Sequence, residues 1–176
     1  GKKRFHPTQK NIKLFEDFLN EAKTLTLFRG QSDEFFNDKK TKGYLEMYGM
    51  LFLSDNINNA YFYSNPGRNK IREILVFEVP ANIAKVQGVY IDRLGDKIQQ
   101  LKKDGYSGVT SNVGELSFDK GEVGMFQNYK PVQRFQTNTG KFTEDDIIKL
   151  KKLGLSNAHV KKETELWNIL NYLNNL

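Results

Sequence analysis

The chain has 176 residues, enough for one domain that buries roughly 70% of its unfolded surface, and its 27 Lys and Arg residues outnumber its 21 Asp and Glu residues. The resulting net charge of +6 favours anionic ligands such as phosphates, dinucleotides or nucleic acids without identifying one. The lack of cysteine and the presence of only two histidines exclude a disulfide scaffold and a thiolate nucleophile and argue against a metal site. No apolar run is long enough to span a membrane and no signal-peptide pattern opens the chain, so we expect a cytoplasmic protein.

In the N-terminal part, apolar residues recur at helical spacing over 8–23, which predicts an amphipathic helix. Residues 24–28 then alternate as a strand does and end in Arg29 and Gly30. An arginine at the end of a buried strand is costly to desolvate unless it meets an anion, and its planar guanidinium suits a phosphate. The glycine would let a ligand approach the backbone closely. A structural ion pair across the sheet is the equally good alternative.

A loop with a short helix is expected over 31–49, and an apolar strand over 49–53 stops at Ser54. Ser54 or Asp55 would cap a helix over 56–64, which explains the serine without catalysis. A serine at a strand end can also orient a neighbouring carboxylate through a hydrogen bond. Both roles need the same position, so both stay open.

The middle of the chain predicts a central strand over 74–79, a strand over 86–91, a helix over 92–103 ended by Gly105, and strands at 108–110, 122–126 and 131–135. Glu122 opens the fourth of these strands, directly after Gly121. A glutamate that begins a half-buried strand beside a glycine can be held in a cleft and aimed at a ligand. The alternative is an ordinary glutamate facing solvent on a strand edge.

At the C-terminal end, residues 137–140 have the composition of a linker. Thr143 predicts the N-cap of a helix that Gly154 ends, and acids in its first turn suit the helix dipole. Residues 158–176 predict a last helix carrying Leu166, Trp167, Ile169, Leu170, Leu173 and Leu176. We therefore expect a domain over 1–136, with its core over 24–135, and a helical hairpin over 137–176 that packs on it. An appendage that binds a partner is the alternative.

Arg29, Ser54 and Glu122 form an ordered trio that resembles the arginine–serine–glutamate signature of the mono-ADP-ribosyltransferases, which include bacterial toxins and phage enzymes. The neighbouring residues agree with it: Leu27-Phe28-Arg29-Gly30, Leu51-Phe52-Leu53-Ser54-Asp55-Asn56 before Ala60-Tyr61, and Gly105-Tyr106-Ser107-Gly108-Val109 ahead of Glu122-Val123-Gly124-Met125-Phe126. The chain looks most similar to such domains in phage and mobile-element proteins. The resemblance spans about residues 24–135 and leaves both terminal helices outside it.

This resemblance implies an α+β fold, with an ADP-ribosyltransferase-like split mixed β-sheet flanked by helices. It implies that the protein transfers ADP-ribose from NAD to a macromolecular acceptor, a protein or a nucleic acid, and releases nicotinamide. NAD is then a substrate and no metal is required. Such an enzyme would act as a phage or toxin effector in the cytoplasm of a host bacterial cell.

The residue roles follow from the same resemblance. Cleavage of the nicotinamide–ribose bond creates an oxocarbenium-like centre, which the carboxylate of Glu122 would stabilise. Arg29 would bind the NAD phosphates, the Gly30 backbone would hold the nicotinamide amide, and Ser54 would orient Glu122. One aromatic ring among Phe36, Phe52 and Tyr61 is expected to stack on nicotinamide.

The chain departs from the family pattern two residues before the glutamate, where many members have Gln or Glu and this chain has Lys120. The lysine argues against transfer to arginine and would suit an acidic or phosphate-bearing acceptor. Lys120 and Phe118 are the residues expected to contact the acceptor; the alternatives are an ordinary loop lysine at 120 and a phenylalanine at 118 that packs inward. Two other functions stay open: an NAD glycohydrolase on the same scaffold, and a basic module that binds nucleic acid or protein without catalysis.

Overall fold

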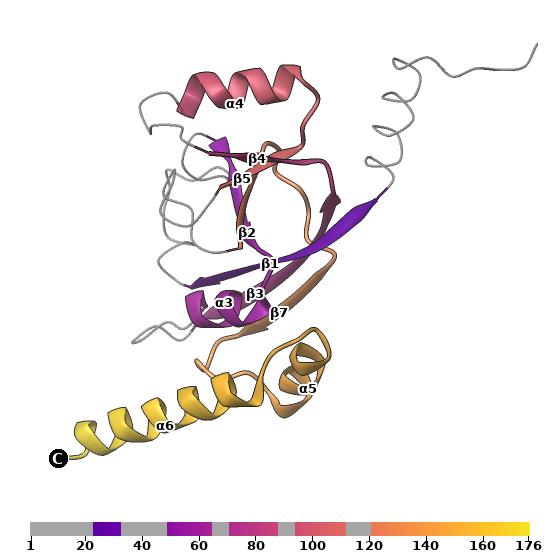
Figure 1. Ribbon diagram of the computed structural model, residues 1–176. Helices are drawn as coiled ribbons and strands as arrows, with labels where there is room; N and C mark the ends of the chain where they lie inside the picture. The colour runs from indigo at the N-terminus through magenta and orange to yellow at the C-terminus, as the bar shows by residue number, and fades with distance from the viewer. Residues whose placement is uncertain (1–22, 33–48, 65–70, 88–93, 112–120) are drawn as a thin grey trace, which may run out of the picture. The chain divides into compact units, whose positions relative to one another are not determined.

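The computed structural model describes residues 23–32, 49–64, 71–87, 94–111 and 121–176 (Figure 1). The helix predicted over 8–23 lies outside these residues except for its last position. The loop expected over 31–49 falls mostly outside them, as do Phe36, Phe118 and Lys120.

The described residues form seven strands and four helices: β1 (Thr24–Ser32), β2 (Leu51–Ser54), α3 (Ile57–Tyr63), β3 (Arg72–Pro80), β4 (Ile83–Val86), α4 (Leu94–Lys103), β5 (Gly108–Ser111), β6 (Glu122–Met125), β7 (Gln133–Thr137), α5 (Glu144–Lys152) and α6 (Asn157–Asn174). The strands belong to one mixed sheet in the order β4-β5-β6-β2-β1-β3-β7. The predicted α+β class is confirmed at this level.

Several predicted boundaries are wrong. Strand β1 continues through Arg29 and Gly30 to Ser32, and β3 begins two residues earlier than predicted, at Arg72. Strand β3 lies between β1 and β7, so it is an interior strand with a neighbour on both sides, although it lies next to the edge strand β7 and not at the middle of the sheet. Strand β4 occupies 83–86, and the strand predicted over 86–91 lies mostly outside the described residues. Strand β7 occupies 133–137, not 131–135.

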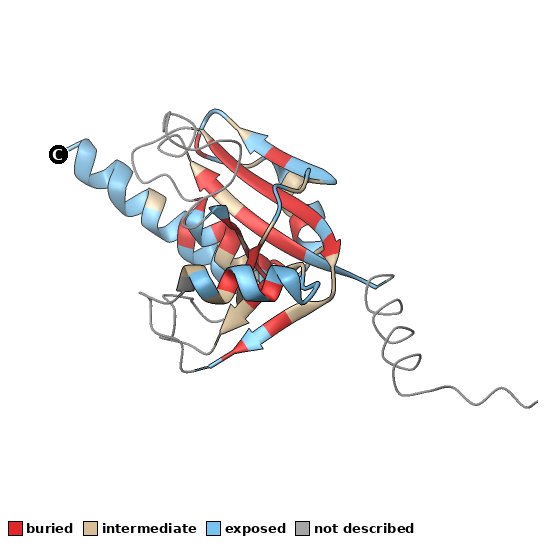
Figure 2. Ribbon diagram, turned by 90° about the horizontal axis from the view of Figure 1, so that it is seen from above, coloured by how far each residue is buried: buried red, intermediate tan, exposed pale blue. Residues whose placement is uncertain are grey.

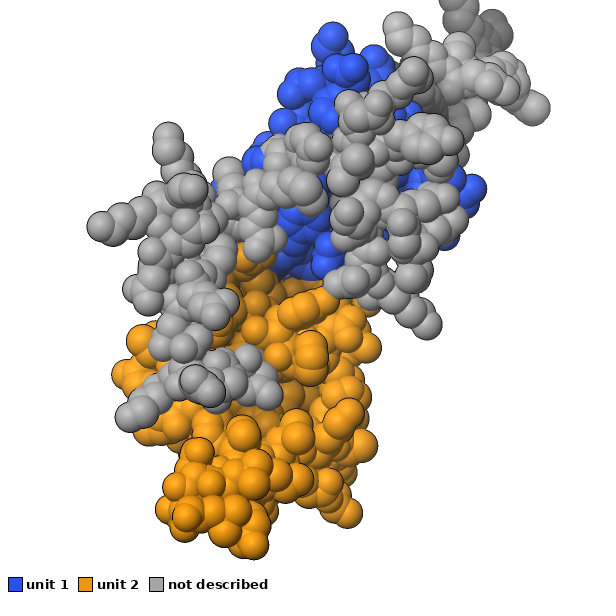
Figure 3. All heavy atoms as spheres, turned by 90° about the vertical axis from the view of Figure 1, so that its left-hand side faces the viewer, with its two compact units in different colours: residues 1–26, 43–53, 77–130 blue, residues 27–42, 54–76, 131–176 orange. Residues whose placement is uncertain are grey.

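The chain divides into two compact units, coloured separately in Figure 3. Unit 1 comprises 1–26, 43–53 and 77–130, and unit 2 comprises 27–42, 54–76 and 131–176. Strands β1, β2 and β3 each contribute residues to both units. The two units interleave along the chain and each contains part of the sheet. The predicted division into a domain over 1–136 and a helical hairpin over 137–176 stays a prediction.

Within unit 1, β4 and β5 are parallel neighbours joined through α4, with Ile83 opposite Gly108. Parallel strands need such a crossover, and α4 covers their apolar side chains. The core of this unit consists of Met50, Ala84, Val86, Ile98, Leu101 and Val109. Gly105 follows α4 with a φ of 88°, a left-handed conformation that favours glycine, and it ends the helix as predicted.

Within unit 2, β3 and β7 pair antiparallel, and α3, α5 and the start of α6 share one core with them. This core contains Phe28, Ile57, Ala60, Tyr61, Ile74, Val76, Phe135, Leu150 and Leu155. Thr143 caps α5 as predicted, because its side chain accepts a hydrogen bond from the backbone N–H of Asp146. The C-terminal helices therefore share in the hydrophobic core of unit 2.

Helix α6 contributes little apolar surface to that core. Its one buried residue is Glu163, and much of the helix is exposed in Figure 2. The apolar residues expected along this helix are mostly exposed: Leu166, Ile169, Leu170, Leu173 and Leu176. The buried contact of α6 lies in its first part, and further along the helix Trp167 is half-buried, with the ammonium group of Lys141 5.9 Å from its ring centroid.

Candidate functional site

The side chain of Arg29 belongs to a buried polar network in unit 2. Its Nε donates a hydrogen bond to Oε1 of Gln31 at 3.1 Å, and Nε2 of Gln31 donates to Oε2 of Glu73 at 2.7 Å. Glu73 also pairs with Nε of Arg134 at 2.6 Å. The amide of Gln31 thus joins a guanidinium to a carboxylate, accepting from one and donating to the other.

This network explains how Glu73 and Arg29 tolerate burial. Arg29 is 7% exposed and Glu73 only 1% exposed. A buried charge is strongly disfavoured unless it is paired and hydrogen-bonded, and Glu73 has both an amide and a guanidinium as partners. An ion pair with a carboxylate across the sheet was one of the two explanations that the sequence offered for Arg29. The structure places one there, with Gln31 between them.

Ser54 ends β2, as predicted, and its hydroxyl organises the start of α3. The hydroxyl accepts hydrogen bonds from the backbone N–H of Asn56 at 3.1 Å and from Nδ2 of Asn59 at 3.3 Å. The N-cap itself is Asn56, whose side chain accepts from the backbone N–H of Asn58. The prediction that Ser54 or Asp55 caps this helix was therefore wrong by one or two residues, because the asparagine side chain performs the same function.

Gly30 lies where α3 comes closest to β1. A Cβ atom at this position would lie 1.7 Å from the carbonyl oxygen of Ala60 and 2.8 Å from the backbone nitrogen of Ser64. Only a residue without a side chain permits this approach. The packing of the helix therefore accounts for Gly30, with or without a bound ligand.

The sheet separates Arg29 from Ser54 and Tyr61 within unit 2. Phe28 is paired directly with Ser54, so these two side chains share a face, and Phe28 packs in the same core as Tyr61. Successive residues of a strand point to opposite faces, so Arg29 points away from that core. The structure therefore does not bring the side chains of Arg29, Ser54 and Tyr61 together. Tyr61 cannot stack on a ligand that is bound at Arg29.

On the helical face, Tyr61 belongs to a second buried cluster, around Arg72. The fully buried guanidinium of Arg72 forms an ion pair with Glu163 of α6 and lies 4.8 Å and 4.7 Å from the ring centroids of Tyr61 and Phe142. It also donates to the backbone carbonyl of Gly140 at 3.0 Å. Burial and a hydrogen bond with Glu163 raise the pKa of the Tyr61 hydroxyl well above its ordinary value. This cluster fixes α6 to the sheet.

Glu122 is part of unit 1 and opens β6, as predicted. Gly121 precedes it with a φ of 76°, so the glycine supplies the turn into the strand that the sequence indicated. The Glu122 side chain is half-buried, and its backbone carbonyl accepts a hydrogen bond from the hydroxyl of Thr110 at 2.8 Å. Phe52, the other described aromatic candidate, packs against the core of unit 1.

Two charged residues at the start of β3, Arg72 and Glu73, were not predicted from the sequence. They directly precede the apolar run over 74–79 that predicted the strand. The signal that could have found them is their alternation with that run: residue 72 is in phase with Ile74 and Val76, and residue 73 with Leu75. Each charge thus continues one buried face of β3, and each meets an oppositely charged side chain there.

Comparison of the chain with protein-family models, with curated proteins and with solved structures found no match. The structure itself defines the class of the protein as mixed α+β, with a seven-stranded sheet among the described residues. None of the helices among the described residues is both long and apolar enough to cross a membrane. In the same residues, no group of three or more His, Asp or Glu side chains is placed to hold a metal ion.

Proposed function

We propose that the chain transfers ADP-ribose from NAD to a macromolecular acceptor and that its core adopts the ADP-ribosyltransferase type of split sheet. The observation that carries the proposal is the strand order. Strands β6, β2 and β1, which carry Glu122, Ser54 and Arg29, are consecutive in the sheet. Residues distant in the sequence therefore come from neighbouring strands, which supports the arginine–serine–glutamate resemblance at the level of strand order, although Arg29 and Ser54 lie on opposite faces of the sheet.

The chemistry assigns a role to each charged residue. The carboxylate of Glu122 would stabilise the positive charge that develops on the ribose as nicotinamide departs. Arg29 would bind the pyrophosphate, with the amide of Gln31 holding its guanidinium in place. Ser54 would act through the start of α3, because its hydroxyl is engaged there. The acceptor would meet Lys120 and Phe118, which lie outside the described residues.

The acceptor in this proposal is a protein or a nucleic acid inside a host bacterial cell, in keeping with a phage or toxin effector. The net charge of +6 supports an acidic or phosphate-bearing acceptor. The reaction uses NAD as its only cofactor-like substrate. Replacement of the acceptor by water would make the same site an NAD glycohydrolase.

The test is incubation of the protein with labelled NAD, with and without a cell lysate. Label on macromolecules supports transfer, free ADP-ribose alone supports hydrolysis, and no NAD consumption rejects both. We expect Glu122→Gln to lower turnover on the order of 100-fold or more, the usual cost of removing a stabilising group from a developing charge. The matched control is Glu78→Gln, at an exposed position of β3. Equal turnover by the two variants would reject the role of Glu122.

A second measurement tests Arg29 separately. Arg29→Lys keeps the positive charge but loses the planar fork, so we expect weaker NAD binding in a calorimetric titration of the folded variant. We also expect a lower thermal transition, because the buried hydrogen bond from Nε to Gln31 is lost. An unaltered dissociation constant would remove Arg29 from the phosphate site.

A further inference from the structure

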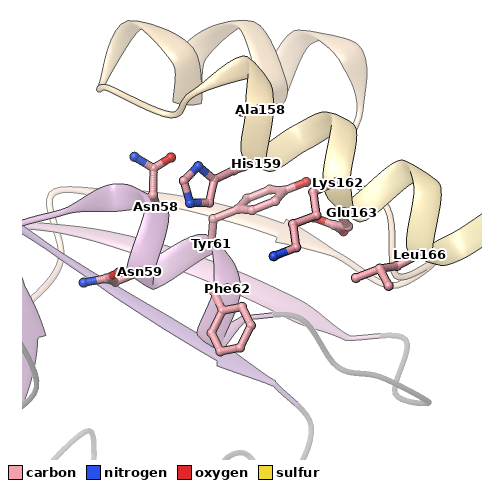
Figure 4. Close-up of a pocket in the computed structure, with 9 residues that line it drawn as sticks. All are labelled: Asn58, Asn59, Tyr61, Phe62, Ala158, His159, Lys162, Glu163 and Leu166. Carbon is pink, nitrogen blue, oxygen red and sulfur yellow. The ribbon is translucent and has the colours of Figure 1, made fainter.

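A hollow between α3 and α6 in unit 2 has the size of a small-molecule site. Its volume is about 390 Å³, within the range of roughly 300–1,000 Å³ that ligand sites occupy. Figure 4 shows its lining, with α3 providing Tyr61 and Phe62 and α6 providing His159, Lys162 and Leu166. None of Arg29, Ser54 and Glu122 lines this hollow, and Tyr61 places it on the face of the sheet opposite Arg29.

The two helices that form the walls are tied together beside the hollow. Oδ1 of Asn58 accepts a hydrogen bond from the backbone N–H of Ser156 at 2.9 Å, which joins α3 to the start of α6. The ion pair between Arg72 and Glu163 fixes α6 about two turns further on. A hollow whose walls are fixed in advance binds a ligand without the entropic cost of ordering them.

The interior is mainly apolar and aromatic. Phe62 is 70% exposed and Leu166 47% exposed, so both present apolar surface that a ligand would cover. The Tyr61 ring also lines the hollow and is held by its contacts with Arg72 and Phe142. Rings of this kind favour a flat or aromatic ligand through offset or edge-to-face packing.

The charge at the hollow is positive. The carboxylate of Glu163 is the one acidic group in the lining, and it is already committed to the guanidinium of Arg72. Lys162 forms no hydrogen bond or ion pair with the described residues, and Figure 4 shows its side chain extending from α6 toward the α3 side. His159 is held by a hydrogen bond between its Nδ1 and the hydroxyl of Ser156, which leaves Nε2 as the ring atom that can meet a ligand.

We propose that this hollow binds a small aromatic anion, with its ring against Tyr61 and Phe62 and its carboxylate or phosphate at Lys162 and His159. The apolar walls supply affinity and the ammonium group supplies selectivity for negative charge. A neutral analogue of the same shape binds more weakly because it leaves the lysine without a partner.

The experiment uses three probes with one ring system: 2-naphthoate, 2-naphthyl phosphate and the neutral 2-naphthamide. Affinities are measured by titration with two-dimensional NMR on the whole chain. Both anions are expected to bind more tightly than the amide. Lys162→Gln is expected to weaken both anions about tenfold, the effect of losing one charge-assisted hydrogen bond, and to leave the amide unchanged. The two anions together show whether carboxylate or phosphate is preferred.

The control variant is Lys161→Gln, which removes the neighbouring charge from the same helix without altering the lining of the hollow. Phe62→Ala is expected to weaken all three probes, because it removes an apolar wall at an exposed position that the fold does not need. Equal binding of anions and amide, equal effects of the two lysine variants, or no saturable binding of either anion would overturn the proposal. NAD consumption by Lys162→Gln is expected to be unchanged, so this test fails or succeeds independently of the proposed transferase activity.

Discussion

Replacement of Glu163 by alanine is expected to destabilise unit 2, because it leaves Arg72 as an uncompensated buried charge. Arg72 is 0% exposed. Removing one partner of a buried ion pair typically costs about 3–5 kcal/mol. The guanidinium keeps hydrogen bonds to the carbonyls of Ser64 and Gly140 and keeps its contacts with two aromatic rings. These remaining partners favour the lower end of the range, about 3 kcal/mol.

The loss is large compared with the total stability of a domain, about 5–15 kcal/mol. Urea denaturation followed by circular dichroism measures it, and a loss of this size lowers the midpoint by about 1 M or more. Glu163→Gln retains an acceptor for the guanidinium and should lose less, on the order of 1–2 kcal/mol. The control is Glu165→Ala, an exposed glutamate on the same helix. If Glu163→Ala lies within about 0.5 kcal/mol of that control, the ion pair does not anchor α6.

Three further predictions follow from contacts in unit 2. Gly30→Ala should cost more than about 3 kcal/mol or prevent folding, because its Cβ would lie 1.7 Å from the carbonyl oxygen of Ala60. The control is Gly95→Ala, whose Cβ would have no atom within 4 Å and which should leave the melting temperature nearly unchanged or raise it. Similar melting temperatures for the two variants would contradict the close packing of α3. Gln31→Met should lower stability by about 1–3 kcal/mol in urea denaturation, because a buried carboxylate and a buried guanidinium each lose a partner, and a neutral result would mean that the amide does not link them. The raised pKa keeps the hydroxyl of Tyr61 protonated in the folded state at pH values where the tyrosine of the unfolded chain has ionised. The contribution of this hydroxyl to the free energy of unfolding is therefore complete below a pH of about 10 and is lost as the pH rises further. Above that pH the stability of the wild type should fall more steeply than that of Tyr61→Phe, and parallel curves of stability against pH would contradict this prediction.

The parts of the fold that the sequence predicts well are those set by local chemistry. The cap at Thr143, the helix end at Gly105 and the strand that opens at Glu122 each depend on residues within a few positions of one another. The apolar runs over 49–53 and 74–79 also correctly predicted the strands β2 and β3. The boundaries moved where a polar residue continued a buried face, as Arg29 does in β1.

The parts that the sequence could not predict depend on partners distant in the chain. Arg72 and Glu163 are 91 positions apart, and Gln31 and Glu73 are 42 apart, so no local pattern signals that these charges are buried together. The face of the sheet on which Ser54 lies follows from its register with Phe28, which only the assembled strands fix. A trio of residue types in the right order can thus be recognised in the sequence, while the direction of each side chain cannot.

The distal part of α6 carries a different implication for the sequence of this chain. Beyond Glu163 its apolar residues are largely open to solvent, so substitution of Ile169 or Leu173 by a polar residue should leave the folded core undisturbed. Selection for folding alone would let those positions drift toward hydrophilic residues. If variants of this protein keep leucine and isoleucine at these positions, the exposed part of the helix has a function other than folding. If they replace them with polar residues, it has none.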